Sequence, residues 1–131
     1  MAEVVGCPCG SGERYDACCG PAHAGSPVPT AAALMRSRYS AFVLGLDAYL
    51  LESWHPSTRP DDLDLDDGVT WRRLQIVDTV AGGPDHAEGV VEFRASYRTP
   101  TGTALLHERS RFVHQDGRWY YLAGEVLGAP G

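Results

Sequence analysis

The sequence predicts an α+β fold, in which helices pack on one face of a four-stranded antiparallel sheet and a small zinc knuckle precedes them. All four cysteines lie within the first nineteen residues. Apolar residues at helical spacing follow from residue 30, and four strand-like runs begin near residue 69. We therefore expect two parts: a zinc knuckle with its linker at residues 1–29, and an α+β domain at residues 30–127.

The composition is that of one small globular protein. The chain has 131 residues, of which 44% are hydrophobic, and this suffices for a single core. Its net charge of −6 argues against general binding of nucleic acids, because such binding needs a basic surface. The sequence has neither an apolar run long enough to cross a membrane nor a secretory signal. We expect a cytoplasmic protein that does not bind membranes.

The four cysteines form two close pairs, Cys7 with Cys9 and Cys18 with Cys19. The glycine-rich sequence between the pairs permits a tight turn, so that four thiolates could surround one ion. Zinc prefers such a tetrahedral set, and four thiolates leave no position for a reacting water, so we expect one structural zinc. His23 is an alternative ligand in place of one cysteine. Free or disulfide-bonded cysteines are the alternative to a metal site.

Two helices are expected after the knuckle. The first should begin after Thr30, which is a good N-cap residue. Asp47 can cap a second, shorter helix that runs to Trp54, and a loop follows with one helical turn at Pro60. The residues expected on the single apolar face of the first helix are Leu34, Met35, Tyr39, Phe42, Val43 and Leu46.

The second half of the chain has β-type sequence in four runs, at about residues 69–80, 88–98, 103–114 and 118–126. Short links rich in glycine and proline separate these runs, which indicates an antiparallel meander. Asp116 and Gly117 lie between the third and fourth runs, and this dipeptide is typical of a two-residue hairpin turn.

The expected turn assigns side chains of the last hairpin to the two faces of the sheet, because directly opposed residues share a face. The face with Phe112, Trp119 and Tyr121 is the richer in aromatic residues, so we expect it to point inward against the helices. The further partners expected on that face are Ser110 with Ala123 and Glu108 with Glu125.

Glu108 and Ser110 need polar partners if they point inward. Arg38 or Tyr39 on the first helix could supply them, which would make a purely structural network. The alternative is a ligand pocket, and two adjacent carboxyl groups, Glu108 and Glu125, would then resemble an acid–base pair. The sequence identifies no catalytic residue. The candidate pocket residues are Arg38, Tyr39, Trp54, Glu108, Ser110, Trp119 and Tyr121.

The cysteine pattern at residues 7–19, Cys-Pro-Cys-Gly-Ser-Gly followed by Cys-Cys, resembles the SEC-C motif, the zinc-binding tail of the SecA preprotein translocase. Nearly the whole chain resembles the YchJ-like family of uncharacterised bacterial proteins. The resemblance implies zinc at the four cysteines and a fold similar to nuclear transport factor two, a curved sheet wrapped around helices with a conical pocket. The segments that carry it are residues 38–42, 54–55, 93–97, 107–112 and 117–121.

The resemblance implies no reaction, so function has to be inferred from the parts. In SecA the SEC-C tail contacts partner proteins and the ribosome, so residues 7–19 could dock a protein partner, and a purely structural staple is the alternative. The leading hypothesis is a non-enzymatic binding or adaptor protein. The alternative is a small enzyme or small-molecule-binding protein that uses the conical pocket around Glu108.

Overall fold

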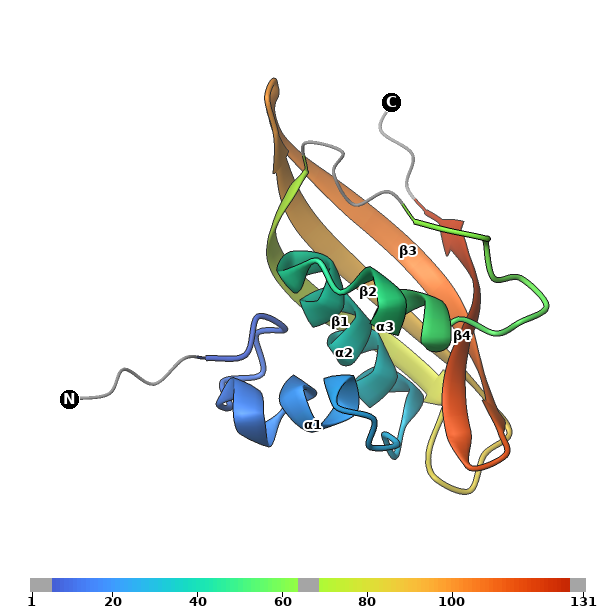
Figure 1. Cartoon of the computed structure of the whole chain (residues 1–131). Helices are drawn as coiled ribbons and strands as arrows, with labels where there is room; N and C mark the ends of the chain where they lie inside the picture. Colours follow the sequence, from blue (N-terminus) through green and yellow to red (C-terminus); the bar gives the residue numbers. More distant parts are fainter. Residues whose placement is uncertain (1–5, 64–68, 128–131) are drawn as a thin grey trace.

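The computed structural model describes residues 6–63 and 69–127. Its centre is a four-stranded antiparallel sheet in the order β1-β2-β3-β4, with helices on one face (Figure 1). No helix of the described part is long and apolar enough to cross a membrane. The predicted α+β architecture is confirmed. The elements are η1 (Tyr15–Ala17), α1 (Cys19–His23), α2 (Ala31–Leu44), α3 (Asp47–Glu52), β1 (Thr70–Ala81), β2 (Glu88–Thr99), β3 (Gly102–Gln115) and β4 (Arg118–Val126).

The sheet is curved, and register shifts in its outer strands account for part of the curvature. β1 shifts register against β2 twice, between Trp71 and Arg73 and between Ile76 and Asp78. Each shift adds a residue to one strand, which bends the strand and increases its twist. The concave face holds α2 and α3, and the opposite face carries no helix (Figure 1).

Helix α2 begins after Thr30 as the sequence predicts. It ends at Leu44, so Leu46, which was expected on its apolar face, lies beyond the helix. The Thr30 side chain accepts a hydrogen bond from the Ala33 backbone N–H at 3.0 Å, which caps the N-terminus. At the other end Gly45 has φ 73°, a left-handed conformation that glycine adopts without strain.

Helix α2 does not have the single apolar face that the sequence predicts. Val43 is 39% exposed, whereas Ser37 and Ser40 are buried. α2 lies between the sheet on one side and α1 with the cysteine segment on the other (Figure 1). Because two sides of the helix are covered, its small polar residues become part of the interior.

The segment after α2 departs from the expectation in two places. α3 ends at Glu52, and Trp54 lies beyond it, forming an isolated parallel bridge with Tyr121 of β4. The backbone of Ser53 also accepts a hydrogen bond from the Tyr121 N–H at 2.8 Å, so pairing with the sheet edge ends the helix. The turn expected from Pro60 is not helical over the described residues 60–63, and its remainder lies outside the described residues.

The β3–β4 hairpin follows the predicted register near its turn, where Phe112 pairs with Tyr121. A register shift between Arg111 and Phe112 then moves every later partner by one residue. The predicted pairs of Ser110 with Ala123 and of Glu108 with Glu125 are therefore wrong. The observed pairs beyond the shift are Arg111 with Ala123, Ser110 with Gly124, Arg109 with Glu125, and Glu108 with Val126.

This shift places a glycine opposite the inward Ser110. A Cβ atom at Gly124 would overlap the Glu108 carboxylate and would lie 2.9 Å from the Tyr121 hydroxyl oxygen. Ser110 donates a hydrogen bond to Glu108 Oε2 at 2.6 Å, so the carboxylate cannot turn aside without losing that bond. The absence of a side chain at residue 124 therefore makes room for Glu108 on the inner face.

The substitution Gly124→Ala should destabilise the protein by about 1–3 kcal/mol, the usual cost of forcing an extra methyl group against packed neighbours, here Glu108 and Tyr121. Urea denaturation of the wild type and the variant measures this loss. In a Glu108→Ala background the same substitution should cost much less, because the overlapping carboxylate is gone. An equal loss in both backgrounds would contradict this explanation.

Candidate metal centre and cavities

The four cysteines expected to bind metal lie together. Their Sγ atoms are all within 4.8 Å of one another, with 3.6 Å between Cys9 and Cys18 and 3.9 Å between Cys18 and Cys19. Four sulfurs at about 2.3 Å from a central zinc ion would stand about 3.8 Å apart at the corners of a tetrahedron. None of the four forms a disulfide. The donor set and its spacing fit a tetrahedral metal ion.

Local backbone geometry brings the two cysteine pairs together. Gly10 and Gly12 have φ of 80° and 88°, in the left-handed region that favours glycine, and they reverse the chain after Cys9. The Cys7 backbone N–H donates to the Glu13 carbonyl at 2.8 Å, which closes this loop. The second pair follows η1, at the start of α1.

The cysteine cluster is built into the interior of the protein. Cys7, Cys9 and Cys19 are 6%, 0% and 3% exposed and belong to the same core cluster as the inner residues of the sheet. Helix α2 contacts the cluster directly: the Ser40 hydroxyl lies 3.5 Å from Cys7 Sγ and donates to Cys19 Sγ at 3.3 Å. Arg36 of α2 donates to the Cys9 carbonyl at 3.1 Å.

The pKa values of three of the cysteine thiols are shifted, and not all in the same direction. The bond from Cys19 lowers the pKa of Cys9 to about 4, although burial opposes this shift. The pKa of Cys19 is raised, first because of its bond to Cys9 and then because of burial. Burial also raises the pKa of Cys18. A bound metal ion would stabilise the thiolate form of its ligands against the effect of burial.

His23 is not among the grouped ligands. One ring nitrogen lies 2.6 Å from the Tyr15 hydroxyl and the other lies 2.8 Å from the Ser37 carbonyl oxygen, so both are engaged. His23 thus fixes α1 against α2, and the group of potential ligands consists of the four cysteines.

An inner cavity of about 140 Å³ lies between α2 and the concave face of the sheet. Six of the seven candidate pocket residues line it: Arg38, Tyr39, Trp54, Glu108, Ser110 and Tyr121. The seventh, Trp119, lies elsewhere, because its indole N–H donates to the Pro29 carbonyl at 3.2 Å and its ring lines a different pocket.

The polar end of the inner cavity is an organised network. Arg38 is only 4% exposed, and its guanidinium donates to the Leu50 carbonyl at 2.8 Å and to the Ser53 hydroxyl at 2.7 Å. The guanidinium carbon also lies 4.5 Å from the centre of the Tyr121 ring and 5.1 Å from that of Trp54. Burial lowers the pKa of Arg38 to about 10, which leaves it charged at neutral pH.

The hydrogen-bond donor to the Glu108 carboxylate is not one of the two residues expected, Arg38 and Tyr39. Ser110 donates to it, and no ion pair joins it to Arg38 among the described residues. Burial and then the charge of Glu108 raise the pKa of Tyr121 to about 12. Glu125 lies opposite Arg109, which contacts Glu92 on the other face, so the proposed pair of carboxyl groups does not form.

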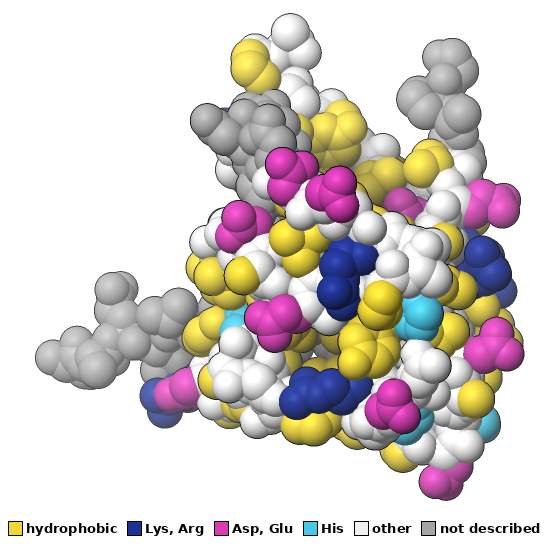
Figure 2. All heavy atoms as spheres, turned by 45° about the vertical axis from the view of Figure 1, so that its right-hand side comes forward, with side chains coloured by type: hydrophobic (Ala, Val, Ile, Leu, Met, Phe, Trp, Pro, Cys, Tyr) yellow, Lys and Arg dark blue, Asp and Glu magenta, His cyan; other side chains and the backbone are white. Residues whose placement is uncertain are grey.

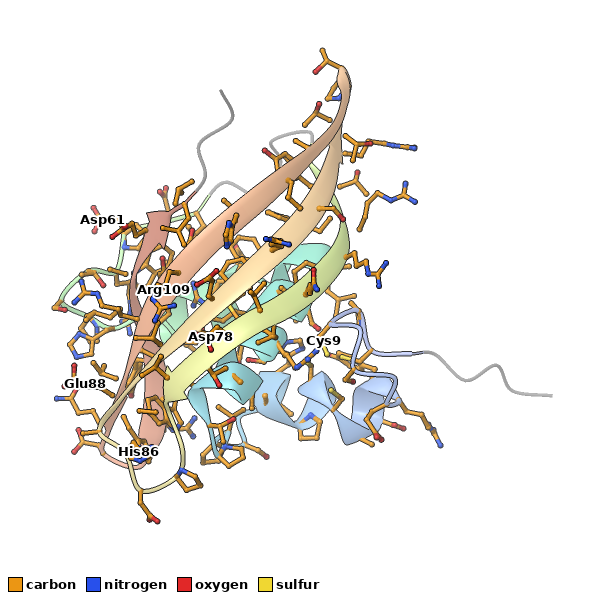
Figure 3. The ribbon with its side chains drawn as sticks, turned by 180° about the vertical axis from the view of Figure 1, so that it is seen from behind. Cys9, Asp61, Asp78, His86, Glu88 and Arg109 are labelled. Atoms are coloured by element: carbon orange, nitrogen blue, oxygen red, sulfur yellow. The ribbon has the colours of Figure 1, made fainter. Side chains whose placement is uncertain are left out.

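The face of the sheet away from the helices carries its own charged cluster. Arg109 donates to Glu92 at 2.9 Å and lies 3.5 Å from Asp78, and His107 lies 2.8 Å from Glu92. The bond to His107, more than that to Arg109, lowers the pKa of Glu92. Arg109 and Asp78 both project from this face (Figure 3).

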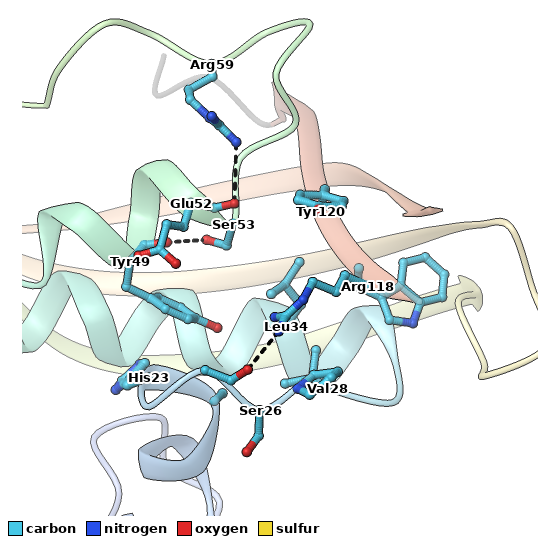
Figure 4. A pocket seen from close by; sticks show the side chains of 14 residues that line it. His23, Ser26, Val28, Leu34, Tyr49, Glu52, Ser53, Arg59, Arg118 and Tyr120 are labelled. Carbon is cyan, nitrogen blue, oxygen red and sulfur yellow. Dashed lines mark hydrogen bonds between the residues drawn. The ribbon is translucent and has the colours of Figure 1, made fainter. Parts of the chain in front are cut away.

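A larger pocket, of about 410 Å³, lies between the linker after α1, helix α3 and strand β4 (Figure 4). Sequence reasoning missed it, because its walls come from three segments far apart in the chain and no motif marks them. The residues that line it are Ala22, His23, Gly25, Ser26, Pro27, Val28, Leu34, Tyr49, Glu52, Ser53, Arg59, Arg118, Trp119 and Tyr120.

Comparison with known proteins agrees with this architecture. Residues 30–124 match the family described as YchJ, middle NTF2-like domain. A UPF0225 protein of Streptomyces coelicolor is 56% identical over 122 residues, which cover 92% of this chain and 95% of that protein. A UPF0225 protein of Chromobacterium violaceum is 53% identical over 126 residues, with 92% of each chain covered.

Two solved structures extend the similarity to the cysteine segment. The solution structure of a SEC-C motif containing protein from Rhodopseudomonas palustris matches with a TM-score of 0.81 and 35% identity, covering 93% of this chain and 98% of that one. The crystal structure of a SEC-C motif containing protein from Psychrobacter arcticus matches with a TM-score of 0.74 and 30% identity, covering 95% and 84%. The chain belongs to the YchJ-like UPF0225 family, with a SEC-C type cysteine cluster joined to an NTF2-like α+β domain.

Proposed function

We propose that this protein is a non-enzymatic, cytoplasmic binding protein whose four cysteines hold one structural zinc ion and whose knuckle docks a protein partner. The observation that carries the metal assignment is the spacing of the four sulfur atoms. Four thiolates fill the tetrahedron and leave no open position, so the metal serves folding and not a reaction.

The position of the cluster supports a structural role for the metal. Residues 6–29 contain only short helices and bury few side chains of their own, so the segment depends on its contacts with α2. A zinc ion would join both ends of this segment and hold Cys7 and Cys19 against Ser40. The free energy of metal binding would then contribute to the stability of the folded state.

Protein purified under reducing conditions should contain one zinc ion per chain. Removing it with a chelator should lower the thermal midpoint by about 10 °C or more, because several kcal/mol of metal binding are lost. Elemental analysis and thermal unfolding measure the two effects. Cys18→Ser should lose the metal, whereas Ser11→Ala, which removes only a hydroxyl 3.1 Å from Cys18 Sγ, should keep it. Freshly purified, unoxidised protein without zinc would rule out the assignment.

The knuckle also presents a surface suited to docking. The loop at residues 10–14 is exposed along its whole length, whereas the cysteines on either side of it are mostly buried. Glu13 and Arg14 give it charge, and Arg14 is held at 2.9 Å by Asp16. A rigid, exposed loop of this kind can contact a partner without a large entropy cost.

A partner that docks on the knuckle should be lost when the loop is altered. Tagged protein captured and cross-linked in its native cells, followed by mass spectrometry, tests this with a Glu13→Ala/Arg14→Ala variant that keeps all four cysteines. A matched control, Arg111→Ala, changes an exposed residue on the sheet instead. We expect the partner to co-purify with wild type and control but not with the loop variant. An unchanged set of partners for all three would contradict docking and leave the metal as a staple.

Small-molecule binding or catalysis in the inner cavity is the second candidate function. It is favoured by the mostly apolar walls of the cavity and by the group of Arg38, Glu108, Ser110 and Tyr121 at one end. The second carboxyl group expected beside Glu108, that of Glu125, lies on the other face of the sheet. For this reason we rank catalysis below binding by the knuckle.

The variant Glu108→Gln separates the two candidates, because a glutamine oxygen can still accept the hydrogen bond from Ser110. We expect the variant to keep its partner and its thermal midpoint. Cell extract incubated with either protein should show no metabolite consumed, as measured by mass spectrometry. Consumption of a metabolite by the wild type and not by the variant would favour the enzyme.

A further inference from the structure

The outer pocket of about 410 Å³ has a feature that the inner cavity lacks: two arginine side chains reach its rim from opposite sides. Arg59 comes from the loop after α3 and Arg118 from the start of β4 (Figure 4). In the space-filling view two basic groups stand above and below a hollow in the middle of this face (Figure 2).

Backbone carbonyl groups hold both guanidinium groups in place. Arg118 donates to the Gly25 carbonyl at 2.9 Å, and Arg59 donates to the Trp54 carbonyl at 3.0 Å. Neither arginine forms an ion pair with any carboxylate in the described part of the chain. A guanidinium carries five N–H groups, so each arginine keeps donors for a ligand and is already positioned to use them.

The pocket is positively charged, whereas the chain as a whole is negatively charged. The protein as a whole carries −6, yet the pocket has two arginines against one carboxylate, Glu52. A net charge near +1 matches a singly charged anion better than a dianion such as a phosphate monoester. An arginine fork also matches the geometry of a carboxylate.

The floor and one wall of the pocket are apolar. Leu34 and Trp119 are buried there, and Val28 and Tyr120 are half-buried beside them. The volume lies within the range of pockets that hold small organic ligands. A ligand that fits must therefore combine an acidic group with an apolar body.

We propose that this outer pocket binds a small organic acid, with its carboxylate held by Arg59 and Arg118 and its apolar part against Trp119 and Tyr120. The site is separate from the cysteine cluster and from the inner cavity. The two cavities share no lining residue, so occupancy of one can be told from occupancy of the other by the tryptophans that line each of them.

A titration with phenylacetate, followed by two-dimensional ¹H–¹⁵N NMR of the full chain, tests the proposal. The chain has three tryptophans, of which Trp119 lines the outer pocket and Trp54 and Trp71 line the inner cavity. We expect a saturable shift of the Trp119 indole N–H signal, with little change at the other two. Phenylacetamide, which has the same shape without the charge, should bind at least tenfold more weakly.

Arginine variants complete the test. Arg59→Gln and Arg118→Gln should each weaken phenylacetate binding about tenfold, whereas Arg111→Gln on the exposed sheet face should have no effect. Because Arg118 also donates to the Gly25 carbonyl, thermal unfolding checks that the Arg118 variant is folded. The Arg59 variant and the comparison of acid with amide test the proposal even if the Arg118 variant does not fold. Equal binding of acid and amide, shifts confined to Trp54 and Trp71, or no saturable shift would each overturn the proposal.

Discussion

The contact between the cysteine cluster and helix α2 is the constraint on which the rest of the structure depends. Ser40 lies within hydrogen-bonding distance of Cys7 and Cys19, and Arg36 fixes the Cys9 carbonyl. The cysteine segment and α1 thereby cover the side of α2 that does not face the sheet. The helix is therefore buried on two sides, and the 24 residues 6–29 that precede it share the core of the α+β domain instead of forming one of their own.

Burial of α2 on both sides explains the polar residues within it. Ser37 and Ser40 allow the cysteine segment to approach the helix closely, because their side chains are small and their hydroxyls find partners. Arg38 spans from the helix to the end of α3, and its charge is stabilised by two hydrogen bonds and two aromatic rings. Among the described residues no buried polar side-chain atom lacks a partner, so the interior is polar in places but satisfied.

The fold and the grouping of the four cysteines could be predicted from the sequence because their signals are local. Thr30 and the Asp116–Gly117 turn act through neighbouring residues, and the spacing of the four cysteines alone indicates that they can surround one ion. The register shift beside Phe112 could not be predicted, since the room that Gly124 leaves for the Glu108 carboxylate becomes visible only once the two strands are paired. One extra residue in β4 then moved Ala123 and Glu125 to the other face.

The outer pocket is formed by residues that lie far apart in the sequence, and one of its walls is connected to the cysteine cluster. The linker that follows α1 supplies Gly25, Ser26 and Val28 to one wall, and the bond from Arg118 to Gly25 ties that wall to β4 across 93 residues of sequence. The same linker is anchored at its other end by Cys18 and Cys19 and by the bonds of His23. Whatever holds the cysteines together therefore also positions one wall of the pocket. A change that separates the cysteines would therefore displace this wall, whereas the four strands would stay hydrogen-bonded to one another in the sheet.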